Sequence, residues 1–382
     1  MLVFPALLLP LSRELGLEMT EMLQVSFWMY LLFGITALPW GMAADRWGAR
    51  PLLLIYHVGA GISGLIAAWQ INSPERLGLA LAGVGLFSGI YHPAGLGWIS
   101  KDIKRVSIGM AYNGMFGNLG LATAPLLAGI VNYFAGPQMV YIILGLLNLS
   151  GLIFVVMTPR SASEGIREKK STGRDESFKA FTILLAAMML GGIVYRSTTV
   201  ILPAYFQLQN NMLLEWLANF ITVPSANVIA TATTSLIFFV GILGQYCGGR
   251  VAEKFELKYA YLCFHAITVP ISFFMAYAAN LLLVFLAIVH AFFLLGMQPI
   301  ENTLVSRFTP RKLQHAAFGM KFILTFGVGS LAVKIIKIIQ SNWGISAVFP
   351  CLALISLILT GVIVILIFNT AKPVASFNKK NI

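Results

Sequence analysis

The stretch GMAADRWGAR, residues 41–50, decides the fold because it sets a dense charged turn inside a strongly apolar region. It carries Asp45, Arg46 and Arg50, while the residues before and after it are mostly apolar. A similar stretch, GGRVAEKFELK, follows at residues 248–258. Two such turns between apolar runs predict short polar connections between membrane helices, and their similarity indicates an internal duplication.

The composition indicates that lipid surrounds most of the chain. Hydrophobic residues make up 58% of the 382 residues, charged residues make up 10%, and the mean hydropathy is +0.83. Soluble domains carry about 25% charged residues, and a helix needs about 20 apolar residues to cross a bilayer core. Runs of this kind predict membrane-spanning helices at residues 23–43, 51–71, 77–99, 108–134, 139–157, 181–207, 228–247, 259–279, 281–305, 316–338 and 347–368.

The formal net charge of +12 reports membrane topology. Most of the 26 basic residues fall in the connections that lie, by alternation, on the same side as residues 41–50. This asymmetry follows the positive-inside rule, so that side is predicted to be cytoplasmic and to contact anionic lipid. Because the charges are spread over these connections, the sequence gives no support to nucleic-acid binding.

The three cysteines, Cys247, Cys263 and Cys351, fall in or at the ends of predicted spans without paired spacing. They indicate neither a disulfide framework nor a metal site, so we expect small packing residues and no metal or cofactor. No basic segment precedes the first apolar run, so the sequence predicts no cleavable signal peptide.

Superposing the two charged turns aligns the two halves of the chain. The aligned pairs are Gly41 with Gly249, Asp45 with Glu253, Arg46 with Lys254, and Arg50 with Lys258. Parallel repeats of six helices are the architecture of one transporter class. We therefore predict an all-α membrane protein of twelve helices. Its six-helix halves are expected at residues 1–157 and 181–368, its cytoplasmic linker at 158–180 and its cytoplasmic tail at 369–382.

The start of the chain departs from this pattern. Residues 2–10, LVFPALLLP, resemble residues 200–208, VILPAYFQL, which lie in the middle of the corresponding helix of the second half. Residues 1–11 are too few to cross a bilayer at 1.5 Å per residue. We expect helix 1 to be truncated at the N-terminus and to begin upstream of Met1; the alternative is half a first helix. With helix 1 complete, both termini are predicted to be cytoplasmic.

The first charged turn resembles the signature of the major facilitator superfamily, G-x-x-x-D-R-x-G-x-R, in the loop between spans two and three, and the resemblance covers nearly the whole chain. The matching residues are Gly41, Asp45, Arg46, Gly48 and Arg50. In this family the motif is understood to hold the cytoplasmic ends of the halves together when the cavity faces outward. Glycine lets helices approach closely, and Asp45 can bridge basic groups or helix N-termini. The alternative is that Arg46 and Arg50 only determine topology.

The second charged turn is expected to take part in the same gate. It retains Gly249, Glu253, Lys254 and Lys258, but Glu256 stands where the turn glycine would be.

Span five, with GNLGLATAPLLAG at residues 117–129, partly fits the G-x-x-x-G-P-x-x-G-G pattern linked with drug/proton antiporters. Small residues and a proline make a thin, bendable helix, so helix packing and a bearing on transport direction both remain open. The helix-packing candidates are Gly117, Gly120, Pro125 and Gly129. Together with YHPAG at residues 91–95, the pattern loosely resembles the fosmidomycin-resistance-type exporters of the superfamily.

Charged side chains at membrane depth are costly, so each is a candidate functional residue. Arg196, deep in span seven, is predicted to hold an anionic group or else to pair with a carboxylate or with helix carbonyls. His92 is a candidate proton carrier, with packing as the alternative. Glu301, near the end of span ten, is predicted to form a gate pair with Arg307 or Arg105 and not to serve as a proton site. Further candidates for substrate or proton binding are Tyr91, Asn113, Asn118 and Gln298.

The resemblance implies a secondary transporter of a small organic solute, working by alternating access in the cell inner membrane as a monomer. The span-five pattern favours proton-coupled export, although span four lacks the arginine that many proton-coupled members have. The sequence contains no G-x-x-x-x-G-K-[ST] loop, which an ATP-driven pump would need to bind phosphate. It also contains no group of residues that indicates an enzyme. The alternative is a non-transporting sensor or assembly partner with a transporter fold.

Overall fold

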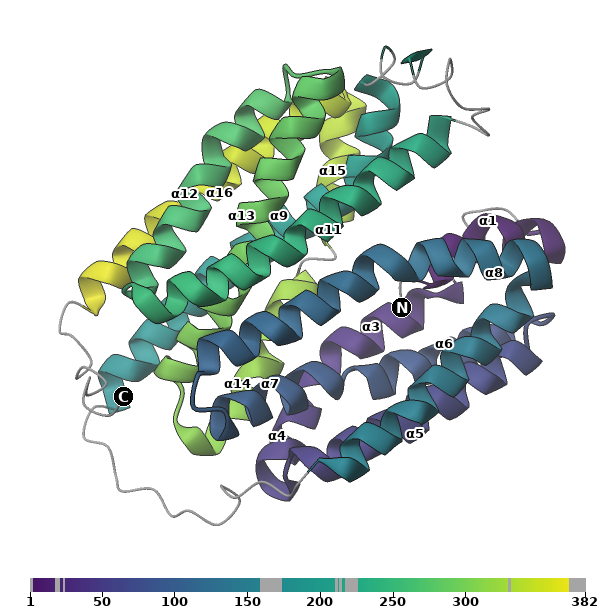
Figure 1. The fold of residues 1–382 in the computed structure, drawn as a ribbon, viewed down its shortest axis with the longest axis horizontal. Helices are drawn as coiled ribbons and strands as arrows, with labels where there is room; N and C mark the ends of the chain where they lie inside the picture. The colour runs from purple at the N-terminus through teal and green to yellow at the C-terminus, as the bar shows by residue number, and fades with distance from the viewer. Residues whose placement is uncertain are drawn as a thin grey trace.

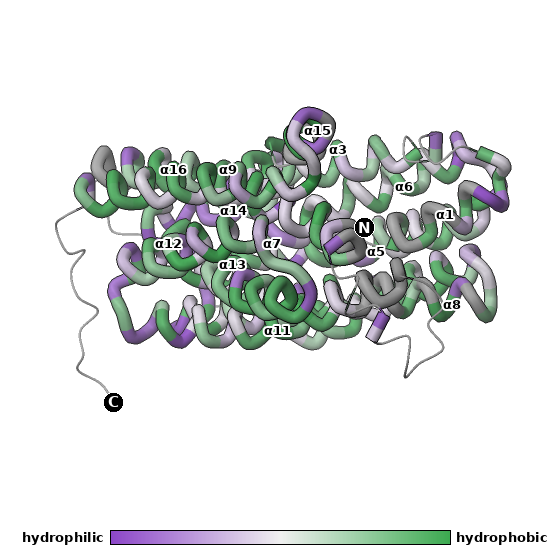
Figure 2. The backbone as a smooth tube through the Cα atoms, turned by 90° about the horizontal axis from the view of Figure 1, so that it is seen from above, coloured by the Kyte–Doolittle hydropathy of each residue, from purple (hydrophilic) through white to green (hydrophobic). Residues whose placement is uncertain are grey.

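The computed structural model describes residues 3–17, 21–22, 25–158, 174–209, 212, 215–216, 226–328 and 331–370. Within these residues the chain is almost entirely helical and contains no strand. Hydrophobic residues continue along most of the helices (Figure 2). Helices of this kind satisfy their own backbone hydrogen bonds, which is what a lipid environment requires. The predicted all-α architecture is confirmed.

The first half of the chain contains two helices that are not straight. α3 and α4 meet at an angle of 43°, and α8 is interrupted at Gly136, where φ is +77°. The helices are α1 (Val3–Leu15), α3 (Phe27–Ile35), α4 (Ala37–Trp47), α5 (Ala49–Trp69), α6 (Pro74–Ser88), α7 (Tyr91–Asp102) and α8 (Val106–Met157).

The second half repeats this pattern, with a π-helical segment, Ile323–Gly327, directly after α14. The helices are α9 (Arg174–Gln209), α11 (Ala226–Lys254), α12 (Leu257–Met275), α13 (Asn280–Phe308), α14 (Gln314–Phe322), α15 (Leu331–Trp343) and α16 (Val348–Asn369). α9 begins at Arg174, inside the predicted linker. The linker residues 159–173 and the tail residues 371–382 lie outside the described part of the chain.

The helices agree with most of the predicted spans. Within the described ranges, eight helical segments are long and apolar enough to cross a bilayer alone, or nine if α3 and α4 form one bent span. The predicted spans 108–134 and 316–338 coincide with the first part of α8 and with the run from α14 to α15. The predicted span 77–99 lies within one candidate span, Pro74–Asp102, in which α6 ends at Ser88 and α7 begins at Tyr91. Proline lacks a backbone N–H and is best tolerated in the first turn of a helix, which is where Pro93 lies in α7.

The two charged turns have different backbones. Gly48, between α4 and α5, has φ +88° and ψ 161°, a conformation that glycine adopts far more readily than other residues. Glu256, at the corresponding place between α11 and α12, has φ −64° and ψ 122°, which suits any residue. The glycine that the second copy lacks is therefore not required there.

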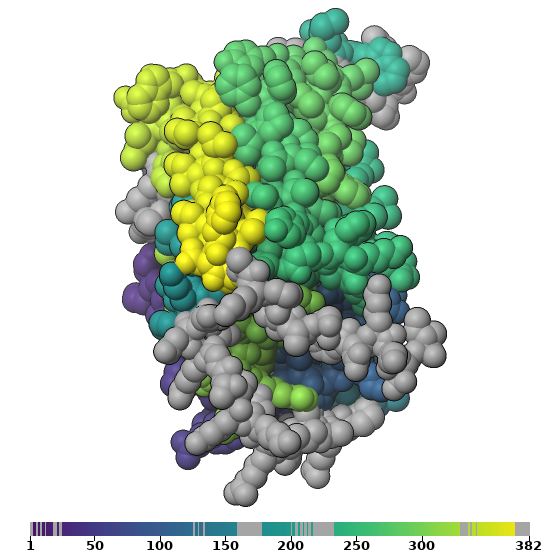
Figure 3. Space-filling model, turned by 90° about the vertical axis from the view of Figure 1, so that its left-hand side faces the viewer, coloured from purple at the N-terminus to yellow at the C-terminus, as the bar shows by residue number. Residues whose placement is uncertain are grey.

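The two halves share a hydrophobic core only in part. One buried cluster combines Ala37, Leu96 and Met110 of the first half with many residues of the second, including Leu184 and Phe318. Other clusters belong to one half alone, and in one view the second half lies above the first (Figures 1 and 3). The shared cluster lies toward the end of the molecule that carries residues 41–50 and 248–258. We call this the charged-turn end.

Candidate functional site

Asp45, at the end of α4, contacts the N-terminus of α14 in the other half. Its Oδ2 accepts a hydrogen bond from the Ala316 amide at 2.8 Å, and its Oδ1 accepts one from the His315 amide at 3.2 Å. Lys101 also donates to Oδ1, at 3.0 Å. The first amides of a helix lack intrahelical partners and form the positive end of its dipole, so a carboxylate is stabilised there. This contact joins the two halves at the charged-turn end.

Glycines allow the backbones around Asp45 to touch. A Cβ added at Gly41 would overlap the carbonyl of His315, and one added at Gly319 would lie 2.6 Å from the carbonyl oxygen of Ala37. The ring Nδ1 of His315 also lies 3.0 Å from the carbonyl oxygen of Pro93. α14 therefore packs directly against α4 and α7, beside which it lies in Figure 1.

Glu253 makes the corresponding contact from the second half. It accepts hydrogen bonds from Nε of Arg105, the residue before α8, at 2.8 and 3.0 Å, and Nη2 of Arg105 also contacts its carboxylate. The hydrogen bond and the opposite charge raise the pKa of Arg105 above its usual value. A Cβ at Gly249 would lie 3.0 Å from the carbonyl oxygen of Ser107. In each half, the acidic residue of the charged turn thus reaches the start of the other half's fifth helix.

The remaining charged residues of the two turns make no described contact with the other half. Arg50 donates to the carbonyl of Val156 at 2.8 Å, and Lys258 donates to the carbonyl of Thr370 at 2.8 Å. Both carbonyls end the sixth helix of their half, so these two residues fix equivalent helix ends. Arg46 and Lys254 are exposed.

Four aromatic rings meet between the halves about midway along the helices. His92 of α7 stacks on Phe322 of α14 with ring centroids 4.5 Å apart, and Phe322 stacks on Phe326 at 5.2 Å. Phe33 of α3 lies 5.4 Å from Phe326. We call Phe33, His92, Phe322 and Phe326 the aromatic layer. It gives His92 a packing role in this conformation, and the proposed proton role of His92 stays a prediction.

Arg196 of α9 is half-buried. Gly192, one helical turn earlier, packs against the backbone of Thr325 in the π-helical segment. Arg196 interacts electrostatically with Tyr30 of α3, in the other half. Among the described residues, no carboxylate pairs with its guanidinium, so the predicted alternative of a structural ion pair finds no partner there.

Glu301 pairs with Lys321, a residue that the sequence analysis did not single out. Lys321 Nζ lies 2.6 Å from Glu301 Oε1 and 2.5 Å from Asn302 Oδ1, and Tyr261 donates to Glu301 Oε2 at 2.6 Å. The side chains of Glu301 and Lys321 are only 4% and 7% exposed. The predicted gate pair with Arg307 or Arg105 is therefore wrong. Glu301 lies inside the second half, out of reach of the surface arginines, and Arg105 is engaged by Glu253. A lysine inside the predicted span 316–338 was the available signal.

The other polar candidates fall into two groups. Tyr91 donates to Asn113 at 3.2 Å, which joins α7 to α8 within the first half. Gln298 accepts from Gln245 of α11 at 2.8 Å, and Gln245 packs against Gly114 of α8. Asn118 is buried, and its Nδ2 has no hydrogen-bond partner among the described residues. These two groups do not form a single cluster with Arg196.

The glycines of span five are not packed as the sequence suggested. A Cβ at Gly117 or Gly120 would meet nothing within 4 Å, so neither residue allows a close helix contact in this conformation. Pro125 and Gly129 lie in α8, but the packing around these two residues lies outside the part of the chain that the structure describes. The close contacts of α8 involve Gly114 and Gly109 instead, for which the pattern gave no signal.

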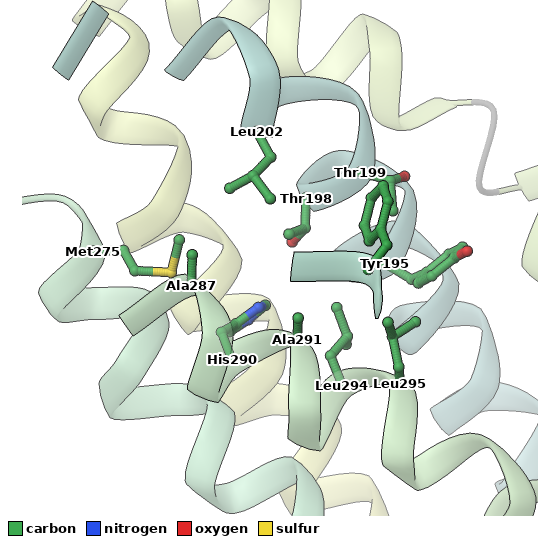
Figure 4. Close-up of a pocket in the computed structure, with 11 residues that line it drawn as sticks. Tyr195, Thr198, Thr199, Leu202, Met275, Ala287, His290, Ala291, Leu294 and Leu295 are labelled. Atoms are coloured by element: carbon green, nitrogen blue, oxygen red, sulfur yellow. The ribbon is translucent and has the colours of Figure 1, made fainter. Parts of the chain in front are cut away.

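Two cavities lie near these residues. A small one, inside the second half, is lined by apolar residues and by His290 and Thr198, which both reach into it (Figure 4). A larger one, of about 820 Å³, lies at the charged-turn end between α9, α13 and α14. Its lining includes Phe181, Leu185 and Met320 together with Arg307 and Arg311.

Comparison with known proteins places the chain in a family. The model of the Major Facilitator Superfamily matches residues 1–332. The chain belongs to the major facilitator superfamily. This membership, together with the all-helical structure, confirms the predicted twelve-helix fold.

Individual members of the superfamily are only distantly similar to this chain. The tetracycline resistance protein, class B, of Escherichia coli is 24% identical over 246 residues, which are 61% of this chain and 58% of that protein. The chain thus matches a little over half the length of that relative.

Solved structures of the superfamily share the fold over nearly the whole chain. The Escherichia coli fucose:proton symporter has a TM-score of 0.70 at 11% identity, covering 95% of this chain and 94% of its own. The human organic anion transporter MFSD10 has a TM-score of 0.73 at 14% identity, covering 93% and 88%. At this level of identity the likeness shows the fold alone.

Proposed function

We propose that this protein is a secondary transporter that moves a small organic solute across the cell inner membrane by alternating access. The observation that carries the proposal is the contact of Asp45 with the amides of His315 and Ala316, which closes the charged-turn end between the halves. The positive-inside bias supports a cytoplasmic location for this end. The cycle then opens this end and closes the opposite one.

The strength of the contact suits a reversible gate. Hydrogen bonds to charged groups contribute about 1.5–3 kcal/mol each, so the two amide bonds of Asp45 together contribute roughly 3–6 kcal/mol. Shifting a two-state equilibrium from 1:99 to 99:1 takes about 5.5 kcal/mol. A solute or a proton whose preference for the state with this end open has a similar free energy would therefore shift the equilibrium. Re-formation of the contact then returns the protein to the outward-facing state.

Proton coupling is assigned in this proposal to Glu301. Its carboxylate faces Lys321 of α14, Tyr261 of α12 and, by an electrostatic interaction, His265 of α12. Protonation of Glu301 removes the negative charge that holds Lys321. Lys321 lies 5.8 Å from the ring centroid of Phe322 and directly precedes that residue, so its release would disturb the aromatic layer between the halves. π-helical segments often mark functional sites. The π-helical segment Ile323–Gly327, directly after α14, therefore supports a functional role for Lys321 and Phe322.

Export is the favoured direction. It is supported by the partial antiporter pattern in span five and by the likeness to a resistance protein.

Flux measurements on the purified protein in sealed vesicles test the proposal. With a pH gradient across the membrane and a pH-sensitive dye inside, a transported solute should accelerate the loss of the gradient. Glu301→Gln leaves Lys321 without its partner charge, so thermal unfolding in detergent first shows whether the variant is folded. In the folded variant, solute exchange should persist while its dependence on the pH gradient disappears. Tight solute binding without any flux would contradict transport and favour a sensor with a transporter fold.

A further inference from the structure

Arg196 is a charged side chain that the described residues leave uncompensated. It lies within α9, and among the described residues its backbone carbonyl accepts a hydrogen bond from Thr199 while its guanidinium donates none. Two tyrosines, Tyr30 and Tyr195, interact with it electrostatically. A charge at membrane depth normally pairs with an opposite charge or marks a substrate path. Since no described carboxylate pairs with Arg196, an anion that enters from outside the chain would stabilise it.

The position of Arg196 relative to three close-packed segments defines its surroundings. Gly192 of α9 packs on Thr325, and Gly34 of α3 packs on Gly327, with 3.7 Å from a Cβ placed at Gly34 to the Gly327 Cα. Arg196 and Tyr30 each lie one helical turn from these glycines, away from the charged-turn end. Both side chains therefore belong to the side of the closed region that faces the opposite membrane surface.

The aromatic layer supplies the floor of this site. Phe33 lies next to Gly34, and its ring is 5.4 Å from that of Phe326, which lies next to Gly327. Phe326 is stacked in turn on Phe322. A guanidinium beside aromatic rings suits a ligand that combines an anionic group with a flat apolar body, because a carboxylate forms paired hydrogen bonds with arginine and rings stack on rings.

Positive charge continues on the other side of the aromatic layer. Arg307 and Arg311 line the 820 Å³ cavity at the charged-turn end, next to Phe181 and Met320. The two sides of the closed region thus combine the same chemistry, arginine with apolar surface. An anion released through the layer would meet a favourable charge on either side.

We infer that the transported solute is an organic anion with a flat apolar body, whose anionic group binds Arg196 and whose body lies on Phe33 and Phe326. This inference rests on the proposed transport function and names its substrate class.

The test compares three probes of similar size and different charge: benzoate, benzyl alcohol and benzylamine. Each is offered to the purified protein in vesicles, and both binding and exchange are measured. Benzoate is expected to bind and exchange, with the other two at least tenfold weaker. Arg196→Gln should weaken benzoate binding about tenfold or more, and Arg196→Lys should recover part of it, since a lysine keeps the charge but not the paired hydrogen bonds. A fourth probe, acetate, carries the anionic group without the ring, and Phe326→Leu should weaken the binding of benzoate more than that of acetate.

A matched control separates this effect from general damage. Arg250→Gln removes an exposed arginine whose guanidinium contacts Tyr246 on the same helix, and it should leave benzoate binding unchanged. Thermal unfolding of each variant in detergent shows whether it is folded. If benzylamine or benzyl alcohol is transported as well as benzoate, or if folded Arg196→Gln binds benzoate normally, the substrate class is wrong while transport stands. If a broad set of solutes gives no flux at all, the proposed function itself fails.

Discussion

The carboxylate of Asp45 and the backbone amide of Ala316 lie 2.8 Å apart across the two halves, and Glu253 with Arg105 forms the corresponding contact from the other half. The two contacts are alike in position but differ in chemistry. Asp45 is partly buried and uses helix amides, whereas Arg105 is exposed to solvent. Charge pairs on an open surface contribute little, so the Asp45 contact should dominate the closure of the charged-turn end.

Replacing Asp45 by asparagine should open that end. The amide keeps an acceptor oxygen but loses the charge that interacts with Lys101 and with the dipole of α14, at a cost of about 1–3 kcal/mol. A cysteine at Ser100, which lines the cavity there, should then react with a maleimide roughly tenfold faster, in a background without the native cysteines. Glu75→Gln, in the first turn of α6, serves as the control and should not change the rate. Equal labelling in both variants would rule out a dominant role for Asp45.

Gly41→Ala should also hold the charged-turn end open, for a steric reason. Its Cβ would overlap the carbonyl of His315, a backbone atom that cannot rotate away. Gly95→Ala is the matched control, because a Cβ there meets nothing within 4 Å. In the same maleimide assay, Gly41→Ala should increase the labelling rate and Gly95→Ala should leave it unchanged. The prediction fails if the two alanine variants behave alike.

Gly48→Ala should destabilise the protein, and a change at the corresponding Glu256 should not. Gly48 has φ +88°, so a side chain there is expected to cost about 1–3 kcal/mol. Glu256 has φ −64° and only a 3.7 Å contact with Lys258, so Glu256→Ala should change stability by about 0.5 kcal/mol or less. Thermal unfolding in detergent would measure both, and a similar loss in the two variants would disprove this difference between the turns.

Lys321→Met should be strongly destabilising, because it leaves the buried carboxylate of Glu301 without its partner charge. Breaking one side of a buried pair costs about 3–5 kcal/mol. Adding Glu301→Gln to this variant should restore most of the stability, since the uncompensated charge is then gone. Thermal unfolding of the single and double variants is the measurement. If the double variant is no more stable than Lys321→Met alone, the pair is not the unit that the 2.6 Å contact indicates.

The elements that the sequence predicted correctly are those that depend on local composition. Apolar runs located nearly all the helices, because a lipid environment forces such runs to satisfy their own hydrogen bonds. The interruption of the helix within residues 77–99 shows the limit. Gly89 and Pro93 are visible in the sequence, but hydropathy does not report where the backbone is interrupted.

The sequence by itself determined the helical membrane fold, the duplication and the motif around Asp45, since all three follow from patterns in neighbouring residues. Only the tertiary structure decided the partners: Asp45 with the start of α14, Glu301 with Lys321, and Arg196 with no described carboxylate. Which side chains meet depends on how each helix is rotated and how closely glycines such as Gly41 let the backbones approach. Those quantities are set by packing between distant parts of the chain, and no local pattern records them.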